Sequence, residues 1–375
     1  MTDVQTPLMR IKHQTRVRDF LALSCQEGHL SHAYLFVGAP GAGKHEMARA
    51  LAQMVVCPNG GDGSCDDCIR VAHRTHPDVH ELEPGGVDGY LIDQIRDLIN
   101  DSQHTPVRSR TKVYILGACE RLRGRPANAL LKTIEEPPAN ALFILIARSV
   151  DTVLPTLVSR CQQVPFRVLS SAEAIASVRE ATGASETDAR IALSVCHAPG
   201  RAESFIESPG RRALRKLVVD TVLSLTDADL WDVLCAAREI AEKVSAPFAE
   251  EREHGEAISK DEAEYLTSAA LKKLEQAMRR DLSARERMAV LEVVDAASSV
   301  LADVSELALG RKDALVNLDV VEGIERLASH TTVSGTIAAL QACKRGRADI
   351  ARNVTPQVAL EVMLLCVKEA LSCQE

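Results

Sequence analysis

Gly38-Ala-Pro-Gly-Ala-Gly43-Lys44-His45 is the stretch that decides the fold of the first half of this chain. It follows an apolar run, Ala33–Val37, and opens a helical pattern that continues to Val56. A glycine-rich loop that ends in lysine and joins a strand to a helix is typical of phosphate binding. Its backbone N–H groups and the helix N-terminus attract a polyphosphate. The residues expected to form this nucleotide-type site are Gly38, Gly41, Gly43, Lys44 and His45.

The groups that would hydrolyse a nucleotide are missing from this loop and from the strand expected beside it. His45 stands where a serine or threonine hydroxyl normally binds Mg²⁺. The strand pattern Lys112–Leu116 runs into Gly117 and Ala118, and neither residue can hold a metal or orient water. The sequence therefore predicts a phosphate cradle without hydrolysis, and it leaves open whether ATP or ADP binds there.

Alternating strand and helix patterns predict an α/β domain with a parallel sheet over residues 1–167. Helices are expected between the strands, for example over Tyr90–Asp101 and Pro126–Glu135. The expected strands are Ala33–Val37, Val79–Glu83, Lys112–Leu116, Leu142–Ala147 and Gln163–Phe166.

Strand patterns end at Phe166, and the rest of the chain is expected to be helical. Residues 168–209 are expected to form a small helical lid, and residues 210–375 an all-helical domain. The charged stretch Ala249–Glu256 is expected to interrupt these helices as a solvated loop or a frayed helix end. The lid helices are Ala172–Thr182, Glu186–Cys196 and Arg201–Ile206. The later helices are Leu214–Leu225, Asp229–Val244, Lys260–Arg280, Ala284–Leu309, Leu315–Ser329, Val333–Arg345 and Pro356–Leu371.

Composition narrows the class of protein. The net charge of −8 argues against a large basic surface for duplex DNA, and an aromatic content of 3% argues against stacking platforms for single strands. No stretch approaches the ~20 apolar residues of a membrane span, and the N-terminus does not resemble a signal peptide. Most of the 11 cysteines are scattered through apolar or helical segments, as buried thiols are. We therefore expect a cytoplasmic protein.

Three cysteines cluster after the phosphate-loop helix. Cys57, Cys65 and Cys68 lie within twelve residues, and the last two form a Cys-x-x-Cys knuckle that suits tetrahedral zinc. A closed structural zinc site needs a fourth ligand, for which the candidates are Asp62, His73 and His76. The alternatives are a surface loop with incidental thiols and a redox pair. A redox pair normally lies between a strand and a helix start, which is not the context here.

Several segments resemble the bacterial clamp-loader subunits, which are AAA+ proteins of the DNA polymerase III holoenzyme. The similarity is dense over the first 170 residues and thin beyond them. It rests on Ser31–Phe36, His76–Val79, Ile92–Arg96, Pro126–Pro138, Leu154–Cys161 and Asn353–Glu361.

The resemblance implies a AAA+ domain with an inserted zinc module at residues 57–76, a lid and a collar domain that assembles a ring. The missing acids at Gly117 and Ala118 match the stator of the family, which does not hydrolyse ATP. In the family's usual set of four cysteines, the second falls at Asp62. Arg160, in Ser159-Arg160-Cys161, matches an arginine finger offered to a neighbouring motor subunit.

The implied assembly is a heteropentamer with gamma/tau motor subunits and a delta subunit, which places a sliding clamp on primed DNA. Two other functions stay open. One is an ATP-hydrolysing motor subunit that uses Glu120 as a displaced base. The other is a zinc-containing nucleic-acid-binding protein on a vestigial ATPase fold, which the acidity and the scarcity of aromatic residues disfavour.

Overall fold

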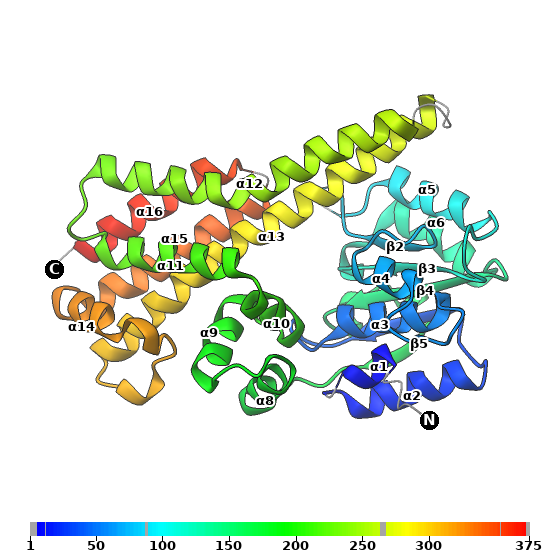
Figure 1. Ribbon diagram of the computed structural model, residues 1–375, viewed down its shortest axis with the longest axis horizontal. Helices are drawn as coiled ribbons and strands as arrows, with labels where there is room; N and C mark the ends of the chain where they lie inside the picture. The colour runs from blue at the N-terminus through cyan, green and yellow to red at the C-terminus, as the bar shows by residue number, and fades with distance from the viewer. Residues whose placement is uncertain (1–5, 12, 87–88, 263–267, 353, 373–375) are drawn as a thin grey trace. The chain divides into compact units, whose positions relative to one another are not determined.

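The computed structural model describes residues 6–11, 13–86, 89–262, 268–352 and 354–372 (Figure 1). The side chains of residues 10, 250, 252–278, 280 and 281 lie outside the description as well. The chain divides into two compact units. The first comprises Met1–Ser177 and Ala198–Gly200, and the second Val178–His197 and Arg201–Glu375. The expected separation of a lid at 168–209 from a domain at 210–375 stays a prediction.

The first unit contains a five-stranded sheet in the order β2-β3-β4-β1-β5, and every pairing is parallel. The sequence-based expectation of a parallel sheet is confirmed, and its strand ends differ by one residue at most. The strands are β1 (Ala33–Val37), β2 (Val79–Leu82), β3 (Lys112–Leu116), β4 (Ala141–Ala147) and β5 (Gln162–Pro165). Strands β3 and β4 are buried along their whole length, as apolar strands covered on both faces are.

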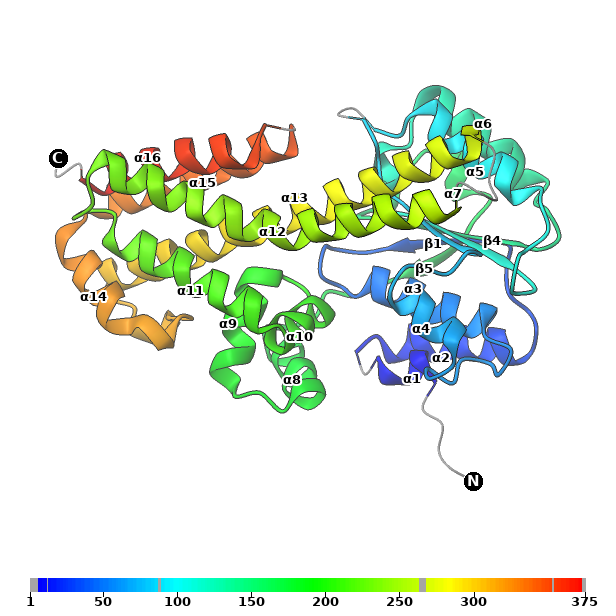
Figure 2. The same cartoon turned by 45° about the horizontal axis from the view of Figure 1, so that its top comes forward.

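Helices cover both faces of this sheet (Figure 2). Alternate residues of each strand point to opposite faces. Phe36 and Ile144 therefore pack under one helical layer, and Leu35 and Phe143 pack under the other. The first layer contains α1 (Pro7–Arg10), α2 (Thr15–Gln26), α3 (Lys44–Val56) and α4 (Asp66–Ala72). The second contains α5 (Ile92–Ser102), α6 (Gly124–Glu135) and α7 (Pro155–Val158).

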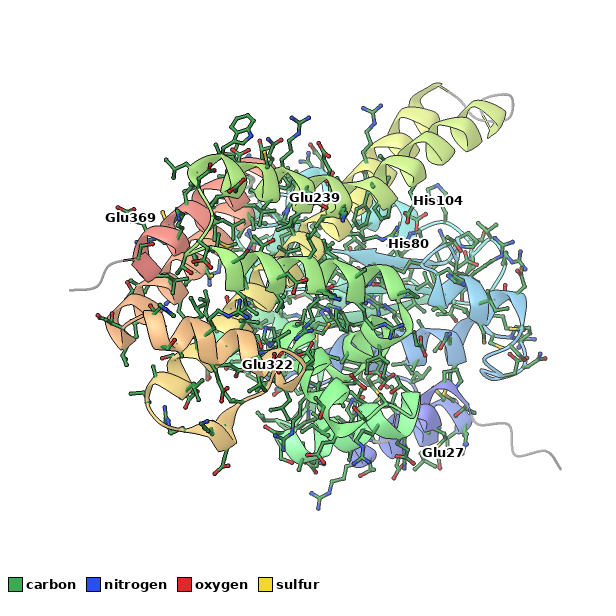
Figure 3. The ribbon with its side chains drawn as sticks, turned by 60° about the vertical axis from the view of Figure 1, so that its left-hand side comes forward. Glu27, His80, His104, Glu239, Glu322 and Glu369 are labelled. Carbon is green, nitrogen blue, oxygen red and sulfur yellow. The ribbon has the colours of Figure 1, made fainter. Side chains whose placement is uncertain are left out.

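The described part of the second unit is helical. Acidic side chains such as Glu239, Glu322 and Glu369 lie exposed on three of its helices (Figure 3). The helices from the end of the sheet onward are α8 (Ser171–Thr182), α9 (Glu186–Cys196), α10 (Pro199–Glu207), α11 (Pro209–Ser224), α12 (Leu230–Glu262), α13 (Ser268–Ala308), α14 (Val321–His330), α15 (Val333–Ala351) and α16 (Pro356–Ser372). None of the described helices is long and apolar enough to span a membrane.

The expected interruption at Ala249–Glu256 is wrong, because helix α12 continues through that stretch to Glu262. The expected break between Arg280 and Ala284 is also wrong, since α13 is continuous. Glutamate, arginine and alanine are good helix formers, so a charged composition does not end a helix. The two helices pack together, and Arg285 of α13 forms an ion pair of 2.6 Å with Glu251 of α12.

The expected helix Leu315–Ser329 begins later than predicted, at Val321. Asn317 explains the delay, because its buried side chain is held from two sides. Its Nδ2 donates to Asp303 Oδ2 at 2.8 Å, and its Oδ1 accepts from Arg215 Nη2 at 2.6 Å. These bonds fix the backbone before α14 in an irregular conformation. Within the expected signature Asn353–Glu361, Asn353 lies outside the described residues, and α16 begins at Pro356.

Candidate functional site

The phosphate loop leaves the carboxyl end of β1, between β4 and β5, and leads into α3. This edge of a parallel sheet is where ligands bind in open α/β folds. Gly41 and Gly43 have φ values of 80° and 81°, a left-handed conformation that favours glycine. Lys44 begins the helix, and its amine donates to the carbonyls of Gly38 at 2.6 Å and Ala39 at 2.7 Å. Burial lowers the pKa of Lys44 to about 8, although the Glu120 carboxylate acts to raise it.

His45 is the second residue of α3 and replaces a hydroxyl that would bind Mg²⁺. Burial, with a smaller contribution from the positive charge of Arg49, lowers the pKa of His45 to about 4. The imidazole is therefore neutral near pH 7. Mg²⁺ prefers oxygen ligands, so a neutral imidazole does not replace the missing hydroxyl.

The lowered pKa of His45 predicts how acid affects stability. The unfolded chain takes up this proton near pH 6.5 and the folded chain near pH 4, so the contribution of His45 to stability is present above pH 6.5 and is lost as the pH falls toward 4. Between pH 7.5 and 4.5, the wild-type protein should lose about 3 kcal/mol more unfolding free energy than His45→Gln. Urea unfolding of both proteins at the two pH values measures the difference, from which other titrating groups cancel.

His29→Gln serves as the control for this experiment, because the His29 side chain is 80% exposed. It should follow the wild-type pH profile. If His45→Gln and wild type lose the same stability between the two pH values, the imidazole is not held neutral in the folded state.

Gly117 and Ala118 follow β3 as the sequence indicates, and a neighbouring carboxylate fills the space beside Gly117. The Glu83 carboxylate, which comes from the end of β2, overlaps the position that a Cβ on Gly117 would take. The surrounding protein atoms raise the pKa of Glu83 to about 7, together with the negative charges of Glu81 and Glu120, although part of the residue is exposed to solvent. An aspartate at position 117 would therefore meet this carboxylate. The corner that binds Mg²⁺ in active phosphate-loop enzymes is occupied by the chain itself.

Glu120, considered above as a displaced base, forms an ion pair with Arg148 Nε at 3.4 Å. Arg148 follows β4 at the same edge of the sheet, and its charge reaches Lys44. This ion pair engages Oε1, whereas Oε2 is buried and has no hydrogen-bond partner among the described residues. The sequence analysis missed both Arg148 and Glu83, although each is a charged residue directly after a strand, at the edge of the sheet where ligands bind.

Arg160 lies at the other edge of the sheet, because it precedes β5 by two residues while the phosphate loop follows β1. Its guanidinium forms an ion pair with Glu135 at 2.5 Å and donates to the Thr156 carbonyl at 3.0 Å. The side chain is 37% exposed. Parallel strands of four or five residues separate their two edges by about 15 Å. Arg160 is therefore a surface residue remote from the phosphate loop of its own chain.

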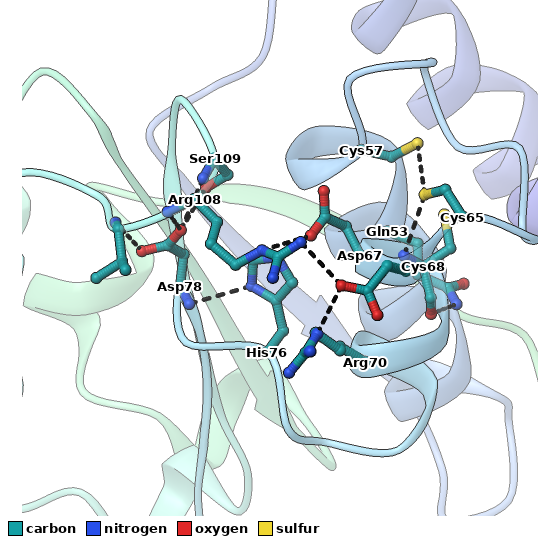
Figure 4. Close-up of polar contacts among 12 residues, drawn as sticks. Gln53, Cys57, Cys65, Asp67, Cys68, Arg70, His76, Asp78, Arg108 and Ser109 are labelled. Atoms are coloured by element: carbon teal, nitrogen blue, oxygen red, sulfur yellow. Dashed lines mark hydrogen bonds and ion pairs between the residues drawn. The ribbon is translucent and has the colours of Figure 1, made fainter.

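The cysteine cluster is compact. One candidate ligand atom from each of Cys57, Asp62, Cys65 and Cys68 lies within 4.8 Å of all the others. The Cys57 and Cys65 sulfurs are 3.5 Å apart (Figure 4). Two sulfurs bound to one tetrahedral zinc are separated by about 3.8 Å. The donor set and its spacing therefore fit a zinc ion.

The structure favours Asp62 among the three candidates for the fourth position. Hydrogen bonds from Asn59, Cys65 and Ser64 hold the pKa of the Asp62 carboxyl well below its usual range, so that it is a carboxylate. His76 is buried elsewhere, with Nε2 3.5 Å from Asp67 and Nδ1 accepting from the Asp78 amide. His73 is exposed at the end of α4 and is not part of the cluster.

A polar network attaches helix α4 to the loop before β3 (Figure 4). Arg108 reaches back to α4, with Nε 3.0 Å from Asp67 and Nη2 2.8 Å from Asp66. Asp78 is fully buried and accepts from the amides of residues 107, 108 and 109. These contacts fix one side of the cysteine module independently of any metal.

Known proteins resemble the part of the chain that carries this site. Residues 13–170 match the family model described as DNA polymerase III, delta subunit. The chain is 37% identical over 159 residues to DNA polymerase III subunit delta' of Bacillus subtilis, which covers 42% of this chain and 48% of that protein. It is 41% identical over 167 residues to subunit delta' of Haemophilus influenzae, covering 43% and 49%. The resemblance to clamp-loader subunits is thereby confirmed for this part of the chain.

Relatives named gamma/tau are similar over a comparable length. DNA polymerase III subunit gamma/tau of Mycobacterium tuberculosis is 34% identical over 160 residues, covering 42% of this chain and 28% of that protein. Each of these alignments spans less than half of the relative. Similarity over this length therefore does not by itself separate the two kinds of subunit.

Proposed function

We propose that this chain is a delta'-type clamp-loader subunit of DNA polymerase III that does not hydrolyse ATP. The observation that supports this proposal is that the residues at the expected Mg²⁺-binding positions cannot bind the ion. Gly117 and Ala118 offer no carboxylate, Glu83 fills the space beside Gly117, and His45 replaces the Mg²⁺-binding hydroxyl. The same geometry argues against a gamma/tau-type motor, whose chemistry needs these groups. The chain would act in the cytoplasm, where the chromosome is replicated.

The proposed partners are gamma/tau motor subunits and a delta subunit in a heteropentamer, which would load the sliding clamp on primed DNA. Arg160 is proposed as the arginine finger that this chain offers in trans. Its place at the amino edge of the sheet supports the proposal, because it cannot reach the phosphate loop of its own chain. A guanidinium is permanently charged and planar, so it stabilises charge on a γ-phosphate across an interface.

A structural zinc ion is proposed at Cys57, Asp62, Cys65 and Cys68. The metal would neutralise the repulsion between thiolates that lie close together. It would also join the end of α3 to the start of α4. All four positions are filled by the protein, so the site is closed and has no catalytic role.

The purified chain should show no ATP turnover above background, since it lacks the hydroxyl and both acids of the reaction. Lys44→Ala should leave this background unchanged. The measurement is phosphate release with and without Mg²⁺, and the cognate gamma/tau subunit serves as the positive control. Mg²⁺-dependent hydrolysis that Lys44→Ala abolishes would identify a motor instead.

A second test of the proposed function is assembly with the partner subunits. Mixed with the cognate gamma/tau and delta subunits, the chain should enter one complex of defined mass by native mass spectrometry. That complex should load clamps on primed DNA, and omission of this chain should prevent loading. Loading at the full rate without the chain would contradict the proposed function.

A further inference from the structure

The imidazole of His13 lies buried against the phosphate loop. Its Nε2 overlaps the position that a Cβ on Gly43 would take. The side chain is 4% exposed, and neither ring nitrogen has a hydrogen-bond partner within the described residues. The nearest carboxylate oxygen, that of Glu46, is 3.6 Å from Nε2. Burial lowers the pKa of His13, and the charge of Arg167 adds to the effect.

The next residue anchors His13 in this position. Gln14 is buried, and its side chain bridges the phosphate loop and the end of the sheet. Its Nε2 donates to the Ala42 carbonyl at 3.1 Å and to the Arg167 carbonyl at 2.7 Å. Its Oε1 accepts from the Arg167 amide at 3.2 Å. The N-terminal segment is therefore fixed over the loop by side-chain bonds on both sides of it.

The contact between His13 and Gly43 bears on whether a nucleotide phosphate can approach the loop. Glycine is used in such loops because phosphates approach the backbone closely, leaving no room for a Cβ. The His13 ring fills the position that a Cβ on Gly43 would take, directly beside this part of the loop. The Lys44 amine, which would neutralise the phosphates, is already bonded to the carbonyls of Gly38 and Ala39. Gly43 and the Lys44 amine are thus both engaged within the chain.

We propose that His13 fills the nucleotide pocket of this phosphate loop and thereby excludes nucleotide from it. An unpartnered buried imidazole gains little from its own hydrogen bonding, so its effect is to occupy space. The inference rests on the proposed role of the chain as a subunit that does not hydrolyse ATP. The new element is that the phosphate loop cannot bind a nucleotide, in addition to lacking the groups that hydrolyse ATP.

Equilibrium binding of ADP to the full chain tests the proposal by calorimetry. His13→Ala should bind ADP at least about tenfold more tightly than wild type, a difference of about 1.4 kcal/mol. His13→Gln, which keeps a side chain of similar length, should stay closed. Adding Lys44→Ala to His13→Ala should remove the gained affinity, because the amine is then absent. His29→Ala, at an exposed histidine, is the matched control and should behave as wild type.

Two results would overturn the proposal. In the first, wild type binds ADP as tightly as His13→Ala. In the second, His13→Ala shows a cooperative melting transition, so that it is folded, but it binds ADP no more tightly than wild type. If His13→Ala does not fold, NMR of wild type decides, since the His13 ring resonances should not shift when ADP is added. A saturable shift would mean that the nucleotide enters the pocket with His13 in place.

The same variant separates this inference from the proposed function. His13→Ala should bind ATP without hydrolysing it, because Gly117 and Ala118 still lack carboxylates. Hydrolysis by His13→Ala would leave the closed-pocket inference intact and would contradict the assignment as a subunit that cannot hydrolyse ATP. Tight ADP binding by the wild-type protein would contradict the closed-pocket inference and would leave the assignment as a subunit that cannot hydrolyse ATP intact.

Discussion

Arg160→Ala should remove most of the ATPase stimulation that this chain gives to the neighbouring motor subunit in the reconstituted complex. Fingers of this kind accelerate phosphoryl transfer on the order of 10³-fold or more, so turnover at that one site should nearly cease. Clamp loading should fall with it. The measurements are single-turnover ATP hydrolysis and clamp loading with complexes that differ only at this position.

The isolated Arg160→Ala chain should remain folded. Arg160 is partly exposed, and its ion pair with Glu135 lies at the surface. Such pairs contribute about 1 kcal/mol at most. Arg160→Lys should restore little activity, because an ammonium lacks the planar, forked donors of a guanidinium.

Arg179→Ala is the matched control, because Arg179 is an exposed arginine on helix α8 of the same chain. It should leave ATPase and loading unchanged. Glu135→Gln should also be tolerated, since it frees Arg160 without removing it. Complexes with Arg160→Ala that hydrolyse ATP and load clamps at the wild-type rate would show that Ser159-Arg160-Cys161 is only a structural turn.

Replacing Cys65 and Cys68 together by serine should release about one zinc ion per chain and unfold the module around it. Zinc binding to a thiolate site contributes directly to folding free energy, on the order of 10 kcal/mol for isolated zinc-binding peptides. The bonds of Asp78 to the amides of residues 107–109 should persist, so the loss should stay local to residues 57–76, which include the Arg108 partners Asp66 and Asp67. Elemental analysis and hydrogen exchange measure the two effects.

Cys235→Ser is the control for thiol loss, because Cys235 is exposed and lies outside the cluster. It should keep its zinc. Asp62→Cys should tighten zinc binding by completing a four-thiolate set, whereas Asp62→Ala should weaken it. Wild-type protein that is folded but contains no zinc after purification without chelators would rule out the structural metal.

The sequence by itself predicted the parallel sheet and the phosphate loop, and it showed that the usual Mg²⁺-binding hydroxyl and acids are missing from their expected positions. The ends of β1, β3 and β4 were predicted to within one residue because these strands are short, mostly apolar runs. Gly117 and Ala118 could be judged directly, since neither side chain can bind a metal whatever surrounds it. The three clustered cysteines were also visible, because short spacing brings side chains together without help from the fold.

Only the tertiary structure decided which distant groups meet. The sequence left Asp62, His73 and His76 equivalent as ligands, and the loop conformation, with its bonds from Asn59, Ser64 and Cys65 to Asp62, placed that carboxylate among the thiols. The contact of His13 with Gly43 and that of Glu83 with Gly117 join residues about 30 positions apart in the chain. Local patterns carry no information on such pairs, because both arise where separate strands and loops converge at one edge of the sheet.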